Sequence, residues 1–159
     1  MDAAFKGRIP DSVLPFPDGL WNQVKYVFWK AITPGYLWGL NLLLDLHILH
    51  HEGRQNFVLG KLASGRKMED FIQYLHFKGY FNHFIAWEDD GQIISLRKLE
   101  NFEWQYHLRV FKDGEVRGHY EYTPESHPKL HLKEIGMEER REVFLNNLGD
   151  WITPVKQEK

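Results

Sequence analysis

The chain contains no cysteine, no excess of basic residues and no long hydrophobic run. Without a thiol it can form no disulfide, no thiol nucleophile and no cysteine-ligated zinc site, which fits a reducing compartment. Lysine plus arginine total 20 against 22 aspartates plus glutamates, so the net charge of −2 excludes a broadly basic coat for nucleic acid. The most hydrophobic stretch, residues 36–49, contains Asn41, Asp45 and His47 and is too short and polar to span a bilayer. A cytoplasmic protein with no membrane partner is therefore predicted.

The composition that is present is typical of one folded domain. With 159 residues, of which 43% are hydrophobic and 15% aromatic, the chain can bury a single core. The first 17 residues carry three prolines and no apolar run, so we expect an irregular arm and neither a signal peptide nor a transit peptide. The expected single domain 1–159 comprises the arm (1–17), a helical half (18–79), a β-meander plus closing helix (80–152) and a frayed tail (153–159).

Two helices are predicted at the start of the helical half. Asp18 can cap a helix over residues 19–32, and the pair Thr33-Pro34 is typical of a helix start, so a second helix is expected from there to near Gly53. This second helix is apolar nearly all round, which indicates that other elements or a second copy of the chain cover it. For a homo-oligomer built on helix 36–50, the buried seam would consist of Leu40, Leu43 and Leu44.

The rest of the helical half gives one ambiguous and one clear pattern. Residues 55–63 fit either a short helix or a strand, and we favour the helix. Residues 67–78 place Met68, Phe71, Ile72 and Leu75 on one stripe, which predicts an amphipathic helix that Gly79 ends.

After Gly79 the hydrophobic period changes to two, which predicts antiparallel strands. In the first hairpin a two-residue turn at Asp90-Gly91 pairs Trp87 with Ile94 and Ile85 with Leu96. That register turns these four residues toward the core and places Ser95 and Arg97 on the opposite face.

The second hairpin has a more informative register. A three-residue turn, Lys112-Asp113-Gly114, with Gly114 left-handed in a bulge, makes one face continuously apolar. The predicted pairs are Val110 with Val116, Leu108 with Gly118, Tyr106 with Tyr120 and Trp104 with Tyr122. A helix over residues 137–151 closes the domain. The predicted fold class is α+β: a helical N-terminal half followed by a four-stranded antiparallel β-meander and a C-terminal helix.

The bulged register also places His107 opposite His119 and Arg109 opposite Arg117, and we call these four residues the His/Arg strip. Opposed arginines repel each other, and a bound phosphate would remove the repulsion. Two imidazoles can act as general base and general acid, while arginine stabilises a phosphoryl transition state. We therefore predict that the strip is catalytic in metal-independent cleavage of RNA or another phosphate-bearing substrate. The predicted substrate-binding residues are His127, His131, Glu121 and Tyr120.

The same residues permit blander interpretations. A solvated sheet face, with Glu103, Gln105 and Glu121 offsetting the arginines, would also satisfy the pattern. His119, His127 and His131 could ligate zinc, but their spacing is weak and fits a hydrogen-bonding loop, so no metal and no cofactor is predicted.

A resemblance to a known family covers the last third of the chain, from about Phe102 to Trp151. The order of features resembles the TumE-type toxins of toxin–antitoxin pairs. The matching pieces are Tyr106-His107-Leu108-Arg109, the turn Asp113-Gly114, the strand ending His119-Tyr120-Glu121, the loop with His127-Pro128 and His131, and the closing helix. The chain departs from the family in having Glu121-Tyr122-Thr123 after the second strand and in its large helical half. The resemblance implies a toxin that acts on RNA or nucleotides and is neutralised by an antitoxin-like protein partner.

The alternative is a non-catalytic module. Aromatic residues such as Phe77, Tyr80, Phe81 and Phe84 could stack on bases of single-stranded RNA or DNA, and the helical half could bind a protein partner. Residues 67–98, a helix followed by a hairpin with basic residues, also resemble part of a winged helix, although core packing explains the helix more simply.

Overall fold

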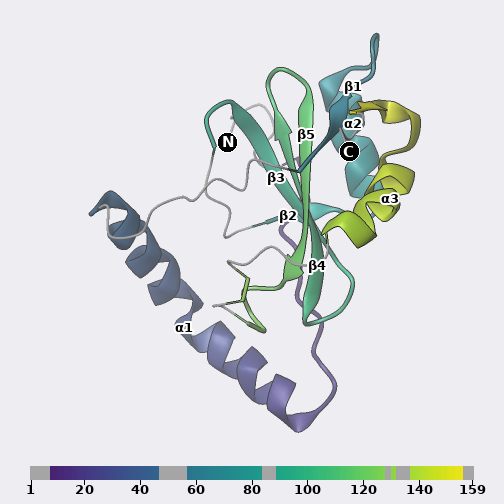
Figure 1. Cartoon of the computed structure of the whole chain (residues 1–159). Coiled ribbons are helices and arrows are strands. Elements are labelled where there is room, and N and C mark those ends of the chain that lie inside the picture. Colours follow the sequence, from purple (N-terminus) through teal and green to yellow (C-terminus); the bar gives the residue numbers. More distant parts are fainter. Residues whose placement is uncertain (1–7, 47–56, 84–88, 128–129, 132–136, 156–159) are drawn as a thin grey trace.

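The computed structural model describes residues 8–46, 57–83, 89–127, 130–131 and 137–155. The elements in chain order are α1 (Leu20–Asp45), β1 (Val58–Leu62), α2 (Met68–Phe77), β2 (Phe81–Asn82), β3 (Gln92–Leu99), β4 (Trp104–Phe111), β5 (Glu115–Tyr122), α3 (Met137–Leu148), the 3-10 turn η1 (Gly149–Trp151) and β6 (Ile152–Pro154). The strands form one antiparallel sheet in the order β2-β3-β4-β5-β1-β6. Helices α2 and α3 lie together on one side, and α1 runs apart from them on the other (Figure 1). The predicted α+β class is confirmed.

The predicted four-stranded meander is present as β2 to β5, but it is only part of a six-stranded sheet. β1 pairs with β5, and β6 pairs with β1. Residues 58–62 therefore do not form the helix that we favoured for 55–63, and the half 18–79 is not wholly helical. The reason is tertiary, because β1 satisfies the backbone groups that β5 would otherwise leave unpaired. Gly60 permits the close approach of β1 and β6, since a Cβ at this position would lie 2.4 Å from the Thr153 carbonyl oxygen.

α1 is a single helix of 26 residues where the sequence predicts two. Pro34 has no N–H to bond the carbonyl of residue 30, yet the chain stays helical through it. The Thr33 hydroxyl donates to the Trp29 carbonyl at 2.6 Å, and the buried Trp29 ring packs on Tyr36 beyond the proline. These contacts span the predicted break, which was wrong. The expected end near Gly53 and the side chains of Leu40, Leu43 and Leu44 lie outside what the structure describes.

The hydrophobic core lies between the sheet and the two helices α2 and α3. Phe71, Ile72 and Leu75 of α2 and Phe144 and Leu148 of α3 are buried there. α2 lies within the predicted range 67–78, and Gly79, with φ of 89°, follows its end. α3 begins where predicted but ends at Leu148, and the last three residues of the predicted helix form the 3-10 turn η1. The sheet contributes Ile94, Leu96, Tyr106, Leu108, Val110, Val116 and Tyr120 to the same core.

The register of the second hairpin is confirmed in full. Val110 pairs with Val116, Leu108 with Gly118, Tyr106 with Tyr120 and Trp104 with Tyr122. Gly114 has φ of 84° and its N–H bonds to the Phe111 carbonyl at 3.0 Å, as the bulged turn requires. This register is what puts the His/Arg strip on one face.

The register of the first hairpin was wrong. Asp90 and Gly91 do form a turn, in which the Gln92 N–H bonds to the Asp89 carbonyl at 3.0 Å. However, Leu96 pairs with Asn82 and not with Ile85. The N-terminal arm explains the shift, because the Asn82 N–H bonds to the Pro10 carbonyl at 3.0 Å and so holds β2 in place. Ile85 and Trp87 themselves lie outside the described residues.

Candidate functional site on the polar face of the sheet

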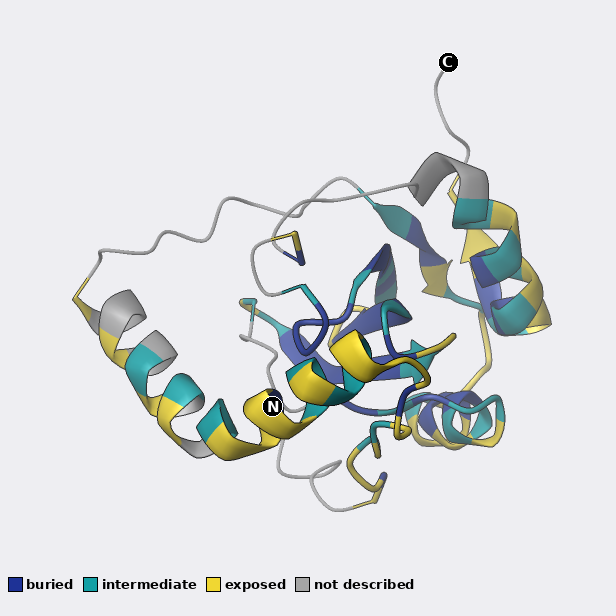
Figure 2. Cartoon of the chain, turned by 90° about the horizontal axis from the view of Figure 1, so that it is seen from below, coloured by how far each residue is buried: buried dark blue, intermediate teal, exposed yellow. Residues whose placement is uncertain are grey.

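The sheet face opposite the core is polar, and it is nevertheless buried. Alternate residues of β3, β4 and β5 point to this face. They are Ser95, Arg97, Gln105, His107, Arg109, His119 and Glu121, each at most 6% exposed. Figure 2 shows the central strands as mostly buried. Because buried polar groups are costly unless they are bonded, the contacts on this face define what it can do.

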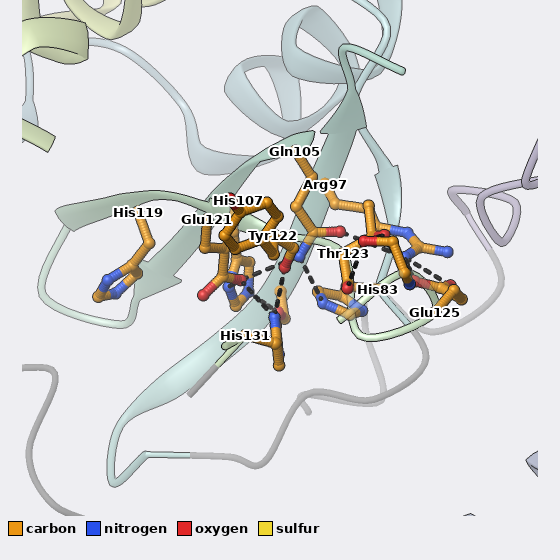
Figure 3. A network of polar contacts seen from close by, with 12 residues as sticks. His83, Arg97, Gln105, His107, His119, Glu121, Tyr122, Thr123, Glu125 and His131 are labelled. Atoms are coloured by element: carbon orange, nitrogen blue, oxygen red, sulfur yellow. Dashed lines mark hydrogen bonds and ion pairs between the residues drawn. The ribbon is translucent and has the colours of Figure 1, made fainter. Parts of the chain in front are cut away.

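Glu121 is the hub of the face. Its side chain is fully buried, and three nitrogens surround its Oε1 atom. Gln105 Nε2 donates at 2.9 Å, His107 Nδ1 lies at 3.2 Å and His131 Nδ1 at 3.6 Å. Figure 3 shows His131 from the following loop reaching back toward Glu121. Glu121 thus connects side chains of β4, β5 and the following loop.

His107 is held at both ring nitrogens. Its Nε2 lies 2.7 Å from Ser95 Oγ and its Nδ1 lies 3.2 Å from Glu121 Oε1. Burial lowers the pKa of His107 to about 3, and the neighbouring Glu121 only partly opposes this effect. The ring is therefore neutral at pH 7, with Nδ1–H directed at Glu121. Ser95, His107 and Glu121 have the connectivity of a catalytic triad, but the Ser95 hydroxyl is fully buried and not placed as a nucleophile.

His83 completes this central group. Its Nε2 lies 3.2 Å from Gln105 Nε2, and its ring contacts that of His107 with centroids 4.8 Å apart. Burial, with Arg97 nearby, lowers the pKa of His83 well below its usual value. In the described part of the chain, His83, His107 and Glu121 form one group whose potential metal-ligand atoms lie within 4.8 Å of one another.

A buried ion pair lies at one end of the face. Arg97 Nη1 is 2.8 Å from Glu125 Oε1, and neither side chain is more than 1% exposed. The same nitrogen donates to Gln105 Oε1 at 3.2 Å, and Arg97 Nε donates to Ser12 Oγ in the N-terminal arm. This pair ties the loop after β5 and the arm to the sheet.

The other end carries the two opposed arginines. Arg109 and Arg117 are paired across β4 and β5, as predicted. Asp89 lies between them: its Oδ2 accepts from Arg109 Nη1 and is 4.0 Å from Arg117 Nη1. Arg109 Nη2 also donates to His119 Nε2, which fixes that ring nitrogen as an acceptor. The anion that relieves the repulsion is thus a carboxylate of the chain itself.

A shallow pocket of about 250 Å³ adjoins this end. Its lining consists of Asp90, Gly91, Phe111, Lys112, Asp113, Glu115 and Arg117. The Arg117 side chain is 21% exposed, and its guanidinium stacks over the Phe111 ring at 4.2 Å. Arg117 therefore connects the buried strip to solvent.

The structure brings most of the predicted site residues together. His107 and His119 face each other with ring centroids 5.8 Å apart, and Figure 3 places His119 to one side of the Glu121 group. His131 joins that group through its Nδ1, which donates to the Tyr122 carbonyl at 2.7 Å.

Two of the predicted residues lie elsewhere. His127 is only partly buried and packs on the Tyr122 ring, where burial and Lys25 of α1 lower its pKa. Tyr120 lies on the opposite, core face, where its hydroxyl donates to Glu100 at 2.5 Å.

Sequence reasoning missed several members of the face. Ser95 and Arg97 were assigned to the non-core face by the period of two, and that period could have added them to the strip. His83, Asp89 and Glu125 come from irregular segments, where no periodicity signals which way a side chain points. Only the tertiary structure shows that they converge.

The chain matches no family model, no curated protein and no solved structure. Within the described residues, no helix has the length and apolar character needed to cross a membrane.

Proposed function

We propose that the arginine end of the polar face binds a phosphate group of RNA or of another phosphate-bearing substrate. The observation that carries the proposal is the cradle of Arg109 and Arg117 around one anionic oxygen, Asp89 Oδ2. A guanidinium fork suits phosphate as well as it suits carboxylate. Asp89 is 30% exposed on its side chain, so a substrate phosphate can exchange for it. The resemblance to TumE-type toxins supports the same substrate class.

The pocket beside Arg117 gives such a substrate a route to the cradle. Lys112 and Arg117 supply positive charge there beside the carboxylates of Asp90, Asp113 and Glu115, and the Phe111 ring supplies an apolar surface. Arg117 Nε also donates to Glu115 Oε1 at 2.5 Å, so a bound phosphate would compete with Glu115 as well as with Asp89. His119 lies next to the phosphate position through its contact with Arg109. Catalysis by the imidazole pair of His107 and His119 stays a prediction. With a pKa of about 3, His107 is neutral at pH 7, where it is not a protonated acid and is only a weak base.

Fluorescence anisotropy with a labelled single-stranded RNA tests the binding step. Arg117→Gln is expected to weaken binding at least tenfold, and Asp89→Asn is expected to strengthen it because the internal competitor loses its charge. Arg140→Gln, which removes a cation on the core side of the sheet, is the matched control. Equal affinities for the wild type and Arg117→Gln would contradict the proposal.

Cleavage of the same RNA is a separate measurement. If the strip is catalytic, the double variant His107→Gln/His119→Gln binds RNA but does not cleave it, while circular dichroism shows an intact fold. Undiminished cleavage by the folded double variant would refute the catalytic assignment.

A second candidate function, self-association, is favoured by the exposed side of α1. A continuous apolar stripe runs along it at intervals of three or four residues. It consists of Leu20, Val24, Phe28, Ala31, Gly35, Trp38, Leu42 and Leu46, all of them exposed. Figure 2 shows the exposed side of α1 along the length of the helix. At the helical rise of about 1.5 Å per residue, the stripe is about 39 Å long. A solvent-facing apolar stripe of this length is typical of an interaction surface.

The order of residues in this stripe points to a second copy of the chain as the occupant. Its centre is small, at Ala31 and Gly35, and no atom of the described structure lies within 4 Å of a Cβ added to Gly35. Large residues follow symmetrically on both sides. In an antiparallel pair of α1 helices, Phe28 would face Trp38 of the other copy while the small residues cross closely.

Light scattering over a range of protein concentrations tests this candidate. A dimer is expected that Gly35→Leu disrupts and that Lys30→Gln, an exposed change beside the stripe, leaves intact. A monomer at every concentration would reject self-association and leave the stripe for a different protein, such as an antitoxin-like partner.

A further inference from the structure

Three acceptor groups from three separate segments meet in the middle of the polar face. His83 follows β2, His107 lies on β4 and Glu121 lies on β5, and their exposed fractions are 3%, 6% and 0%. Their potential ligand atoms lie within 4.8 Å of one another. His107 Nδ1 and Glu121 Oε1 are 3.2 Å apart. Two ligands of a tetrahedral zinc ion, each at a bond length of about 2.1 Å, are about 3.4 Å apart, so this pair already has ligand spacing.

The chemical types of the three ligand groups indicate which class of ion would bind. Two imidazoles and one carboxylate are the ligands of zinc and of related divalent transition metals, whereas calcium and magnesium take oxygen ligands. Three protein ligands also leave a coordination position for water or for a substrate atom.

Partners that hold the ligands in place are present as well. Ser95 Oγ lies 2.7 Å from His107 Nε2, so it can accept that N–H when Nδ1 is the ligating atom. Gln105 Nε2 donates to Glu121 Oε1 at 2.9 Å, and Arg97 holds the other end of the Gln105 amide. Such outer partners orient the rings and carboxylates of metal sites.

His131 forms the wall of the group nearest the following loop. Its Nδ1 bonds to the Tyr122 carbonyl at 2.7 Å and lies 3.6 Å from Glu121 Oε1. Its ring also contacts that of His83, with centroids 6.2 Å apart. A third imidazole, that of His131, therefore lies next to the three ligand candidates (Figure 3).

We propose that His83, His107 and Glu121 form a binding site for one divalent transition-metal ion of the zinc class. The site stands independently of phosphate binding, because it uses neither Arg109 nor Arg117. Where both operate, the ion and the phosphate cradle share one face of the sheet through His107 and His119.

Titration of the EDTA-treated, dialysed full-length chain with zinc chloride tests the site by calorimetry. We expect one ion per chain with a Kd of about 1 µM or tighter. Cobalt(II) is the second probe, because a tetrahedral site containing imidazole gives visible absorption that needs no variant. Absence of both saturable zinc uptake and a cobalt spectrum would overturn the proposal, whether or not the chain binds RNA.

Substitutions locate the ion. Glu121→Gln and His107→Gln are each expected to weaken zinc binding 100-fold or more. His127→Gln removes a nearby histidine that lies outside the group and is expected to leave the affinity unchanged. Should a ligand variant fail to fold, the cobalt spectrum of the wild type and the His127→Gln control still decide the question. Zinc bound equally by the wild type and by folded Glu121→Gln would place the ion elsewhere and refute the site.

Discussion

The two faces of β3, β4 and β5 are both buried, yet different interactions stabilise them. The core face packs residues such as Leu96, Leu108 and Val116 against α2 and α3, where each buried apolar side chain contributes about 1.5–3 kcal/mol. The polar face buries arginine, glutamate and histidine, whose desolvation opposes folding unless every group is bonded. A stable fold does not need the second arrangement. The comparison therefore teaches that burial marks the core on one face, whereas the buried charges on the other face are the reason for proposing a functional site there.

The largest effect is expected from breaking the ion pair of the polar face. Arg97→Met leaves the Glu125 carboxylate buried without its cation, and we expect the free energy of unfolding to fall by about 3–5 kcal/mol. Urea denaturation measures the change. The double variant Arg97→Met/Glu125→Leu should recover most of the loss, because an apolar pair replaces both charges. A loss below about 1 kcal/mol in the single variant would show that the pair is unimportant for stability.

The core face is tested by filling a closely packed position, Gly118. A Cβ at Gly118 would lie 2.7 Å from Leu59 Cδ1 and 3.2 Å from the Phe144 ring. Gly118→Ala is therefore expected to lower stability by about 1–3 kcal/mol in urea denaturation. The matched control is Gly39→Ala in α1, where no described atom lies within 4 Å of the new Cβ and where alanine favours a helix by about 1 kcal/mol. Equal effects at the two glycines would contradict the packing described for this face.

Lowering the pH should reduce the stability contributed by the polar face but not that contributed by the core face. The pKa of His107 is about 3 when folded, against 6.5 for an exposed histidine, so only the unfolded chain takes up the proton between these values. Its contribution to stability is complete above pH 6.5 and is lost as the pH falls toward 3. The groups facing its ring are Glu121, His83, His119 and Arg109. In EDTA, His107→Gln should flatten the pH dependence of the urea midpoint, whereas Leu148→Ala in the core should lower the midpoint equally at pH 7.5 and 5. An unchanged slope in folded His107→Gln would exclude a buried neutral imidazole.

The smallest effect is expected outside both faces. Lys61 and Asp113 form an ion pair at 2.8 Å, but more than half of each side chain is exposed. Solvent screens such pairs, so Lys61→Gln is expected to leave the urea midpoint within experimental error. A large drop would mean that the surface, and not the two buried faces, determines stability.

The second hairpin could be predicted from the sequence because the position of its turn and the alternation of its apolar residues indicate the same register. Only one register around Gly114 makes the Val110 face continuously apolar, and that register also opposes the two arginines. The helices α2 and α3 were predictable for a similar reason, since each has a stripe that the sheet buries.

The remaining features depend on contacts between distant segments. β1 is a strand because β5 is there to pair with it, and β2 is held by the arm at Pro10. α1 continues through Pro34 because Trp29 and Tyr36 pack across the proline. The polar face was predicted only along β4 and β5. Asp89, which takes the place expected for a phosphate, comes from an irregular segment with no periodic signal.

The central claim is that the polar face is a ligand site, with His83, His107 and Glu121 at its middle. Anomalous diffraction at the zinc edge, from crystals of the full-length chain grown with zinc, tests it most directly. The account predicts one strong peak within about 2.0–2.2 Å of a nitrogen of each histidine and an oxygen of Glu121. A map with no peak there, in which Gln105 still bonds Glu121, would show that the network only stabilises the fold.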